Sequence, residues 1–167
     1  MGYTHYWGWC TQPADIKDFA NKFKKASQMA KINVEKARLE LVKRGKDPKK
    51  LELHWADGFG LPTFNAQEVV FNGPDNCNCE SMWMNNITDR DAYEYHNGSF
   101  CWCPKFDKGG WFTKTDRLPY GYAVAVTLRT FAKVFKNDFK YWSDGHMTSG
   151  EDYSIDPDWE IAQEIVK

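Results

Sequence analysis

Aromatic residues occur at nearly every second position in the first extended segment of the chain, from Tyr3 to Trp9. In an extended chain, successive side chains point to opposite faces. One face then carries Tyr3, His5, Trp7 and Trp9, and the other carries Thr4, Tyr6 and Gly8. Both faces hold rings, which predicts a strand in the interior of a sheet, covered on each side.

A different period follows, in which apolar residues recur every three or four positions between Ala14 and Arg44. This spacing predicts a long amphipathic helix over that range, which Gly45 ends. The apolar positions are Ile16, Phe19, Phe23, Ala26, Ala30, Val34, Ala37 and Leu41. The opposite face is basic and carries Lys17, Lys24, Lys25, Lys31 and Arg38.

The rest of the chain mixes short strand patterns with two further helical patterns. Strands are predicted over Glu68–Asn72, Ser81–Asn85, Ser99–Pro104 and Lys140–Trp142. Helices are predicted over Tyr120–Asn137 and over Trp159–Val166, the latter capped by Asp158. This order predicts an α+β fold in one domain, residues 1–167. A single, mainly antiparallel sheet would carry two main helices and a short C-terminal helix.

Composition adds an uneven charge and a high aromatic content. Residues 1–50 hold 12 Lys or Arg and 5 Asp or Glu, whereas residues 138–167 hold 2 and 8. A basic face can attract phosphate, but a solvated helix face is the commoner explanation. Aromatic residues make up 16% of the chain, which fits either a binding surface or an aromatic core.

The pattern of apolar residues also bears on location. No run of eighteen apolar residues is present, and the first residues lack the basic and apolar regions of a secretory signal. The five cysteines are therefore expected to be in a reducing compartment. The sequence predicts a cytoplasmic protein that makes no contact with a membrane.

Four of the cysteines form two close pairs, Cys77 with Cys79 and Cys101 with Cys103. Residues two apart in a strand point the same way, so two neighbouring strands could direct four thiolates at one zinc ion. Structural zinc sites usually have two to four residues between paired cysteines, and here there is one. Free buried thiols are the alternative, with no cofactor bound.

His5 and Asp144 are the candidates for acid–base chemistry. His5 lies between two tyrosines on a predicted central strand, and Asp144 follows the last predicted strand. The histidine could equally be a core imidazole with one buried hydrogen bond, and the aspartate could simply form a turn. No phosphate-binding loop, dinucleotide fingerprint, His-Glu-x-x-His helix or Gly-x-Ser-x-Gly elbow occurs in the sequence.

Several short motifs together resemble a group of uncharacterised proteins from bacteriophages and bacterial mobile elements. The motifs are Met1-Gly2-Tyr3-Thr4-His5-Tyr6-Trp7, Phe71-Asn72-Gly73, Phe100-Cys101, Pro119-Tyr120, Ser143-Asp144-Gly145 and Trp159. The resemblance implies a phage-encoded cytoplasmic accessory protein and supplies no catalytic residue, because the group has no established activity. Cys77, Cys79, Cys103 and the stretch from Asp89 to Lys114 depart from its pattern.

Two functional classes follow from these features. The first is an accessory protein with a possible counter-defence role that binds a nucleotide-like ligand or a host component, with aromatic rings stacking on a base. Its ligand-binding residues would be Tyr3, His5, Trp7, Tyr120 and Asp144. The second is an enzyme acting on a nucleotide or nucleic acid, with His5 as general base and Asp144 as its orienting or metal-binding carboxylate. Inhibition of a host protein through the basic helix is a further alternative.

Overall fold

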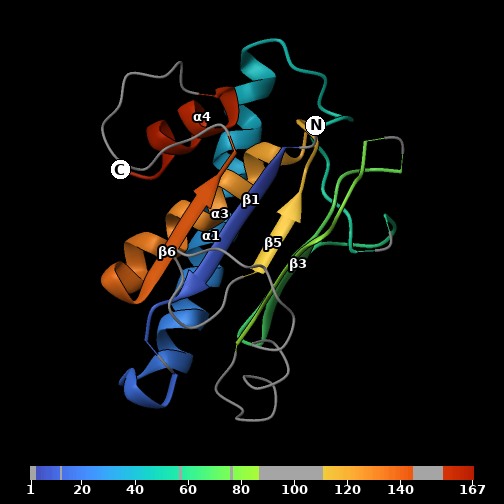
Figure 1. Ribbon diagram of the computed structural model, residues 1–167. Coiled ribbons are helices and arrows are strands. Elements are labelled where there is room, and N and C mark those ends of the chain that lie inside the picture. Colours follow the sequence, from blue (N-terminus) through green and yellow to red (C-terminus); the bar gives the residue numbers. More distant parts are fainter. Residues whose placement is uncertain (1–2, 12, 57, 76, 87–110, 145–155) are drawn as a thin grey trace.

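The computed structural model of the protein describes residues 3–11, 13–56, 58–75, 77–86, 111–144 and 156–167. Figure 1 shows the strands on the near side and the helices behind them. The elements are β1 (Thr4–Trp9), α1 (Phe19–Lys43), β2 (Thr63–Phe64), β3 (Glu68–Phe71), β4 (Met82–Asn85), β5 (Trp111–Lys114), α3 (Gly121–Phe135), β6 (Phe139–Ser143) and α4 (Pro157–Ile165). The predicted α+β class is confirmed.

Strand β1 lies between β5 and β6 and is antiparallel to both. The predicted interior position of this aromatic strand is therefore confirmed. Tyr6 lies opposite Phe112 on β5 and opposite Trp142 on β6, so the three strands place a ring at the same level. The centroids of the Tyr6 and Trp142 rings are 4.9 Å apart. Such cross-strand aromatic pairs favour this register.

The prediction of a single sheet is wrong, because the strands form two three-stranded sheets, β5-β1-β6 and β2-β3-β4. Strands β3 and β4 pair as neighbours, but β5 pairs with β1 instead of extending them. The sheets adjoin at Glu80, whose N–H donates to the Lys114 carbonyl at 3.1 Å. The Thr113 hydroxyl donates to the Glu80 carbonyl at 2.9 Å. These bonds involve a single residue next to β4, and a continuous sheet needs a ladder of them.

Helix α1 begins at Phe19, five residues later than predicted, after a 3-10 turn over Pro13–Asp15. Asp18 precedes it with φ 59, and a left-handed residue cannot continue a right-handed helix. The predicted end at Gly45 is confirmed. Gly45 has φ 85, and its N–H donates to the carbonyl of Val42. The N–H of Lys46 donates to the carbonyl of Leu41, which completes a Schellman motif.

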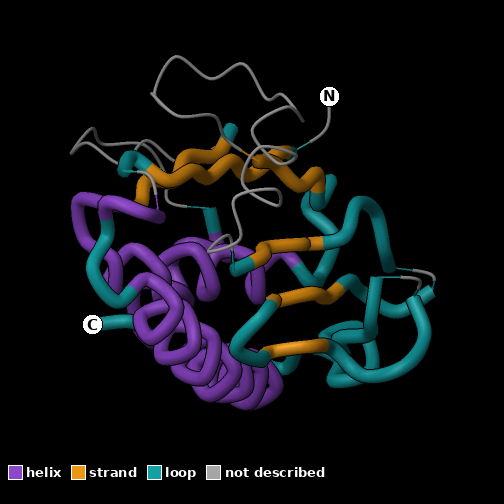
Figure 2. The backbone as a smooth tube through the Cα atoms, turned by 90° about the horizontal axis from the view of Figure 1, so that it is seen from below, coloured by secondary structure: helices purple, strands orange, loops and turns teal. Residues whose placement is uncertain are grey.

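Helix α3 is the centre of the core and corresponds to the helix predicted over Tyr120–Asn137. All of its residues from Gly121 to Leu128 are buried. It packs on α1 and α4 and also contacts β1 and β6. In Figure 2 the helices gather on one side of the strands. Trp9 of β1 fixes one end of this packing, with its ring centroid 4.6 Å from that of Phe135.

Helix α4 is capped by Asp156 and not by Asp158, which corrects the prediction by two residues. The Asp156 carboxylate accepts a hydrogen bond from the N–H of Asp158 at 3.0 Å, and Pro157 fills the first helical position. Proline suits that position because its missing N–H would have no partner there. Asp158 is thereby placed in the first turn, beside the start of α3, where a side chain on Gly121 would collide with its carboxylate.

Some predictions lie outside the described residues, among them the strand Ser99–Pro104 with Cys101 and Cys103. Within the described ranges, no helix is both long enough and apolar enough to cross a bilayer.

Candidate ligand-binding site

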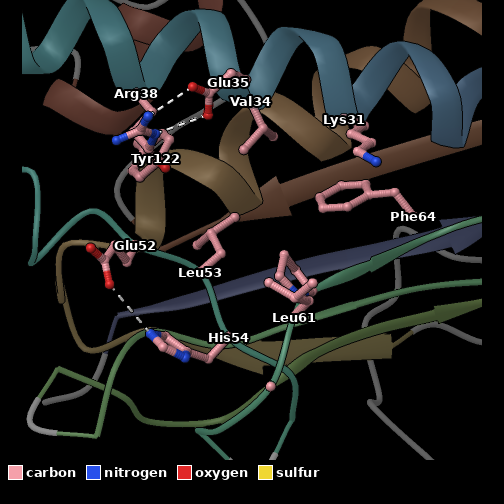
Figure 3. A pocket seen from close by; sticks show the side chains of 12 residues that line it. Lys31, Val34, Glu35, Arg38, Glu52, Leu53, His54, Leu61, Phe64 and Tyr122 are labelled. Atoms are coloured by element: carbon pink, nitrogen blue, oxygen red, sulfur yellow. Dashed lines mark hydrogen bonds and ion pairs between the residues drawn. The ribbon is translucent and has the colours of Figure 1, made fainter.

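A cavity of about 480 Å³ lies between α1 and the chain from residue 52 to residue 64 (Figure 3). One wall is α1, the other is formed by residues 52–54, 60–62 and 64, and Tyr122 of α3 lines the cavity beside Arg38 and Glu35 (Figure 3). The second wall is tied to β3 at two places, because β2 pairs with β3 and His54 bridges to Asn72, the residue after β3. The volume is within the range of small-molecule sites in proteins.

Charged side chains of α1 enter this cavity at successive turns. The Arg38 guanidinium donates to both carboxylate oxygens of Glu35, at 2.9 and 2.8 Å. These hydrogen bonds hold the pKa of Glu35 below its ordinary value. Lys31, one turn earlier, makes no ion pair with another described residue. The α1 wall therefore presents one neutralised pair and one unneutralised ammonium group.

The facing wall is mostly apolar, with one polar pair at its edge. In Figure 3, Leu53 and Leu61 lie across the cavity from the α1 side chains, and Phe64 lies beside Lys31. Leu61 is 86% exposed, so most of this side chain faces solvent at the edge of the cavity. At the edge, Nε2 of His54 lies 3.8 Å from a Glu52 oxygen. A ligand with an apolar body and an anionic group could contact the apolar wall with the first and Lys31 with the second.

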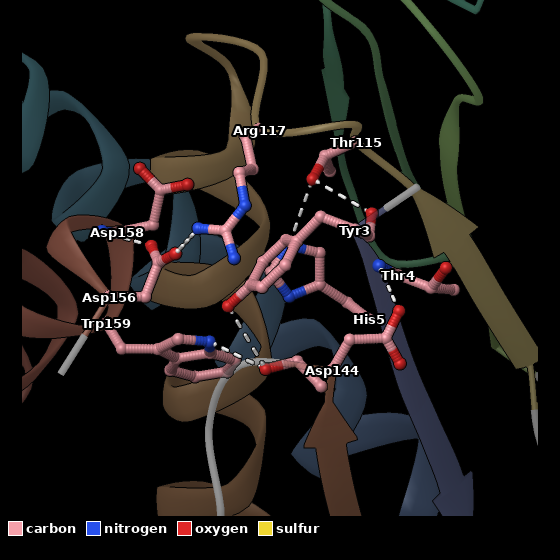
Figure 4. Close-up of polar contacts among 10 residues, drawn as sticks. Tyr3, Thr4, His5, Thr115, Arg117, Asp144, Asp156, Asp158 and Trp159 are labelled. Atoms are coloured by element: carbon pink, nitrogen blue, oxygen red, sulfur yellow. Dashed lines mark hydrogen bonds and ion pairs between the residues drawn. The ribbon is translucent and has the colours of Figure 1, made fainter. Parts of the chain in front are cut away.

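Three of the five ligand-binding residues predicted from the sequence lie elsewhere, at the end of the β5-β1-β6 sheet (Figure 4). Tyr3, His5 and Asp144 come together there. Oδ2 of Asp144 accepts a hydrogen bond from the N–H of Thr4 at 3.0 Å. The Tyr3 hydroxyl lies 3.5 Å from the hydroxyl of Ser143. The structure thus joins the N-terminal and Ser-Asp motifs through hydrogen bonds that fasten strand ends.

His5 is fully buried in this cluster. Its Nε2 lies 3.2 Å from the hydroxyl of Thr115, and its Nδ1 has no hydrogen-bond partner among the described residues. The Tyr3 ring meets the imidazole edge to face, with centroids 5.0 Å apart. Burial lowers the pKa of His5 to about 3. The imidazole is therefore neutral near pH 7, and it is a much weaker base than a general base matched to that pH.

The aromatic side chains predicted to stack on a ligand are also enclosed. Tyr3, Trp7 and Tyr120 are each at most 3% exposed. The Tyr120 hydroxyl donates to the carbonyl of Glu80 at 2.8 Å, and the Arg117 guanidinium lies 4.4 Å from the centre of the Tyr3 ring. The protein itself covers the faces of these rings, so they contribute to its core and leave no surface for a base.

Arg117 also links this cluster to α4. Its guanidinium lies 2.6 Å from the Asp156 carboxylate, whose second oxygen caps the helix. Asp116 and Arg117 have φ values of 54 and 60, which non-glycine residues seldom adopt. Burial, and then the charge of Asp156, raise the pKa of Asp158 to about 7. The carboxylates of Asp156 and Asp158 therefore lie close to one arginine, Arg117, and the Asp158 carboxylate is partly protonated near pH 7.

This dual use of Asp156 predicts unequal effects of two substitutions. Asp156→Ala is expected to lower the free energy of unfolding by about 1–2 kcal/mol, because both the cap and the Arg117 contact are lost. Asp156→Asn keeps a capping oxygen and is expected to lose less. Urea denaturation of both variants checks this, with Glu160→Ala in the same helix as the control. Equal losses for the alanine and asparagine variants would show that the cap contributes nothing.

The cysteines do not form a metal site within the part of the chain that is described. Cys77 is buried, Cys79 is half-buried, and both are free thiols. No group of three metal-ligating side chains is found among the described residues, and Cys101 and Cys103 lie outside them. The predicted four-cysteine zinc site therefore stays a prediction.

The sequence pattern placed Lys31 and Arg38 of the cavity on the basic helix face and Val34 on the apolar face, and it indicated no cavity. It gave no role to Leu61 or Phe64, which lie in or next to the loop after His54. One signal was present, because a loop that carries apolar residues next to two glycines is poorly explained by solvation alone. The contact of this loop with α1 joins residues about thirty positions apart, which no local pattern reveals.

Comparison of the chain with known protein families, curated proteins and solved structures gave no match. The resemblance to phage and mobile-element proteins accordingly stays a prediction.

Proposed function

We propose that the protein binds a small ligand with a flat or compact apolar body and one anionic group, in the cavity beside α1. The cavity itself carries this proposal, since it combines an apolar wall with an unneutralised ammonium group in about 480 Å³. Most small-ligand sites share this composition, in which apolar walls supply affinity and a few polar groups fix orientation. The sequence predicted a nucleotide-like ligand at the N-terminal strand, and we now propose the cavity beside α1 as the binding site for such a ligand.

A nucleoside monophosphate is the ligand class with the best match to the lining. Its base would lie against Phe64 and Leu61, and its phosphate would approach Lys31. Glu52 and His54, at the opposite edge, offer an acceptor and a ring nitrogen to a base or ribose. We do not assign catalysis, because His5 is a weak base at neutral pH and is enclosed.

Titration calorimetry with four nucleoside monophosphates and the four matching nucleosides tests this proposal. Each monophosphate that binds is expected to bind about tenfold tighter than its nucleoside, because only the phosphate reaches Lys31. Lys31→Met should remove that difference while leaving nucleoside binding unchanged.

Lys36→Met is the matched control, since it removes the same charge from an exposed position of α1 that does not line the cavity. It should leave the tenfold preference intact. If no monophosphate binds at millimolar concentration, or if both lysine variants lose the preference equally, the proposed site is wrong.

A further inference from the structure

The solvent face of α1 carries an apolar stripe that the fold does not use. Ile32 and Leu39 are 57% and 48% exposed, and they are seven residues apart, so they lie two turns apart on one side of the helix. The buried face of α1 is formed by other residues, among them Phe23, Ala30 and Ala37. The core is therefore complete without the two exposed aliphatic side chains.

Unneutralised lysines border this stripe. Lys36 is four residues after Ile32 and is its neighbour on the helix surface. Lys25 is seven residues before Ile32, on the same side of the helix but two turns away, and Lys24 lies to one side of that line. All three are exposed, and none makes an ion pair with another described residue.

Three other cations of the same helix do have partners, whereas Lys31, which lines the cavity, makes no ion pair with a described residue. Lys22 lies 3.9 Å from Asp138, Lys43 lies 3.7 Å from Glu40, and Arg38 binds Glu35. The stripe therefore combines exposed aliphatic surface with three lysines that make no ion pair with a described residue. Glu35, which also borders the stripe, is already paired with Arg38.

We propose that the α1 surface formed by Lys24, Lys25, Lys36, Ile32 and Leu39 binds an acidic amphipathic segment of a partner protein. Apolar side chains of the partner would cover Ile32 and Leu39, and its carboxylates would lie beside the lysines. Amphipathic helices recognise their targets with this combination of apolar anchors and complementary charge. This interaction goes beyond the proposed ligand site and uses no side chain of the cavity.

A protein partner fits this surface better than a nucleic acid does. Single-stranded nucleic acids bind through aromatic side chains that stack on bases, and phosphates are contacted by Lys and Arg. The stripe between these lysines holds aliphatic side chains and no ring. A sugar-phosphate backbone would leave Ile32 and Leu39 uncovered, whereas leucines on a partner helix would bury them.

The test uses a fluorescent 20-residue peptide designed as a helix with one leucine face bordered by glutamates. Its anisotropy is measured with the full chain at 50 and 300 mM salt. The peptide is expected to bind at least tenfold more weakly at the higher salt. Ile32→Ser/Leu39→Ser should weaken binding at least tenfold at either salt, although the charge is unchanged.

The lysines are tested by a pair of triple variants with equal charge. Lys24→Gln/Lys25→Gln/Lys36→Gln should weaken binding and reduce the salt dependence. Lys46→Gln/Lys49→Gln/Lys50→Gln, at exposed positions outside the surface, should bind as the wild type does. Thermal unfolding confirms that each variant is folded, which the exposure of the altered side chains favours.

Three outcomes would overturn the proposal. The first is no binding of the peptide at millimolar protein and low salt. The second is binding that the serine double variant leaves unchanged. The third is a single-stranded oligonucleotide that binds more tightly than the peptide and displaces it. Each of these results leaves the cavity proposal untouched, because nucleotide binding depends on Lys31 and the opposite wall.

Discussion

Gly73→Ala is expected to lower the free energy of unfolding by about 3 kcal/mol, at the upper end of the cost of overpacking. A Cβ atom at this position would lie 2.1 Å from the carbonyl oxygen of Cys77 and 2.9 Å from Cδ1 of Tyr120. The first contact is with the backbone of a tight turn, and the second is with a fully buried ring. Neither can move without disturbing the junction of the two sheets.

Gly45→Ala is the matched control for this prediction. Gly45 has φ 85, and a Cβ there would meet no atom within 4 Å, so the same substitution costs only the left-handed conformation. That cost is about 1–2 kcal/mol. Urea denaturation of both variants measures the difference. A Gly73 variant as stable as the Gly45 variant would mean that the turn can open without loss.

The second large effect concerns how the free energy of unfolding depends on pH. His5 and Asp158 are expected to change it in opposite directions, so that the two contributions cancel in the wild-type protein. The pKa of His5 falls to about 3 in the folded chain because the imidazole is buried. The unfolded chain takes up this proton below pH 6.5, the ordinary value. Folded stability therefore decreases as the pH falls from about 6.5 toward 3.

Asp158 has the opposite effect. Its pKa rises to about 7 in the folded chain because of burial and the neighbouring Asp156, whereas the unfolded carboxyl loses its proton near 3.8. Folded stability therefore decreases as the pH rises from about 3.8 to 7. Between pH 3.8 and 6.5 the two effects cancel, each with a slope of up to about 1.4 kcal/mol per pH unit.

Substitution of either residue should leave the pH dependence that the other residue causes. Relative to the wild type, Asp158→Asn should make the free energy of unfolding increase with pH between 4 and 6, and His5→Gln should make it decrease. The double variant should match the wild-type slope, which is the internal control. Urea denaturation at half-unit pH steps checks this. Parallel curves for Asp158→Asn and the wild type would show that Asp158 titrates with its ordinary pKa.

The sequence predicted most of the elements because they depend on local periodicity. The three helices and strands β1, β3, β4 and β6 each follow an alternating or three-to-four residue pattern. The predicted helix starts were wrong where the conformation or the capping of a single residue decides where the helix begins. Asp18 adopts a left-handed conformation that delays α1, and Asp156 caps α4 in place of Asp158. The division into two sheets depends on long-range pairing of β5 with β1, which no local pattern encodes.

The site was harder to predict for a related reason. Residue types drew attention to Tyr3, His5 and Trp7, since rings and imidazole suit ligand binding. The same types also suit a core, and only burial distinguishes the two uses. The cavity depends on the space between α1 and a loop whose residues are individually ordinary. Sequence patterns report which faces are apolar but not where two packed elements leave a gap.

The central claim is that ligands enter the cavity beside α1 and not the cluster around His5. Chemical-shift mapping of the isotopically labelled protein with adenosine monophosphate tests it most directly. The account predicts that the largest shifts occur at Lys31, Leu53, Leu61 and Phe64, with Tyr3, His5 and Thr115 unchanged. Shifts concentrated at Tyr3, His5 and Asp144 would contradict the account, because they would show that the enclosed N-terminal strand opens to a ligand.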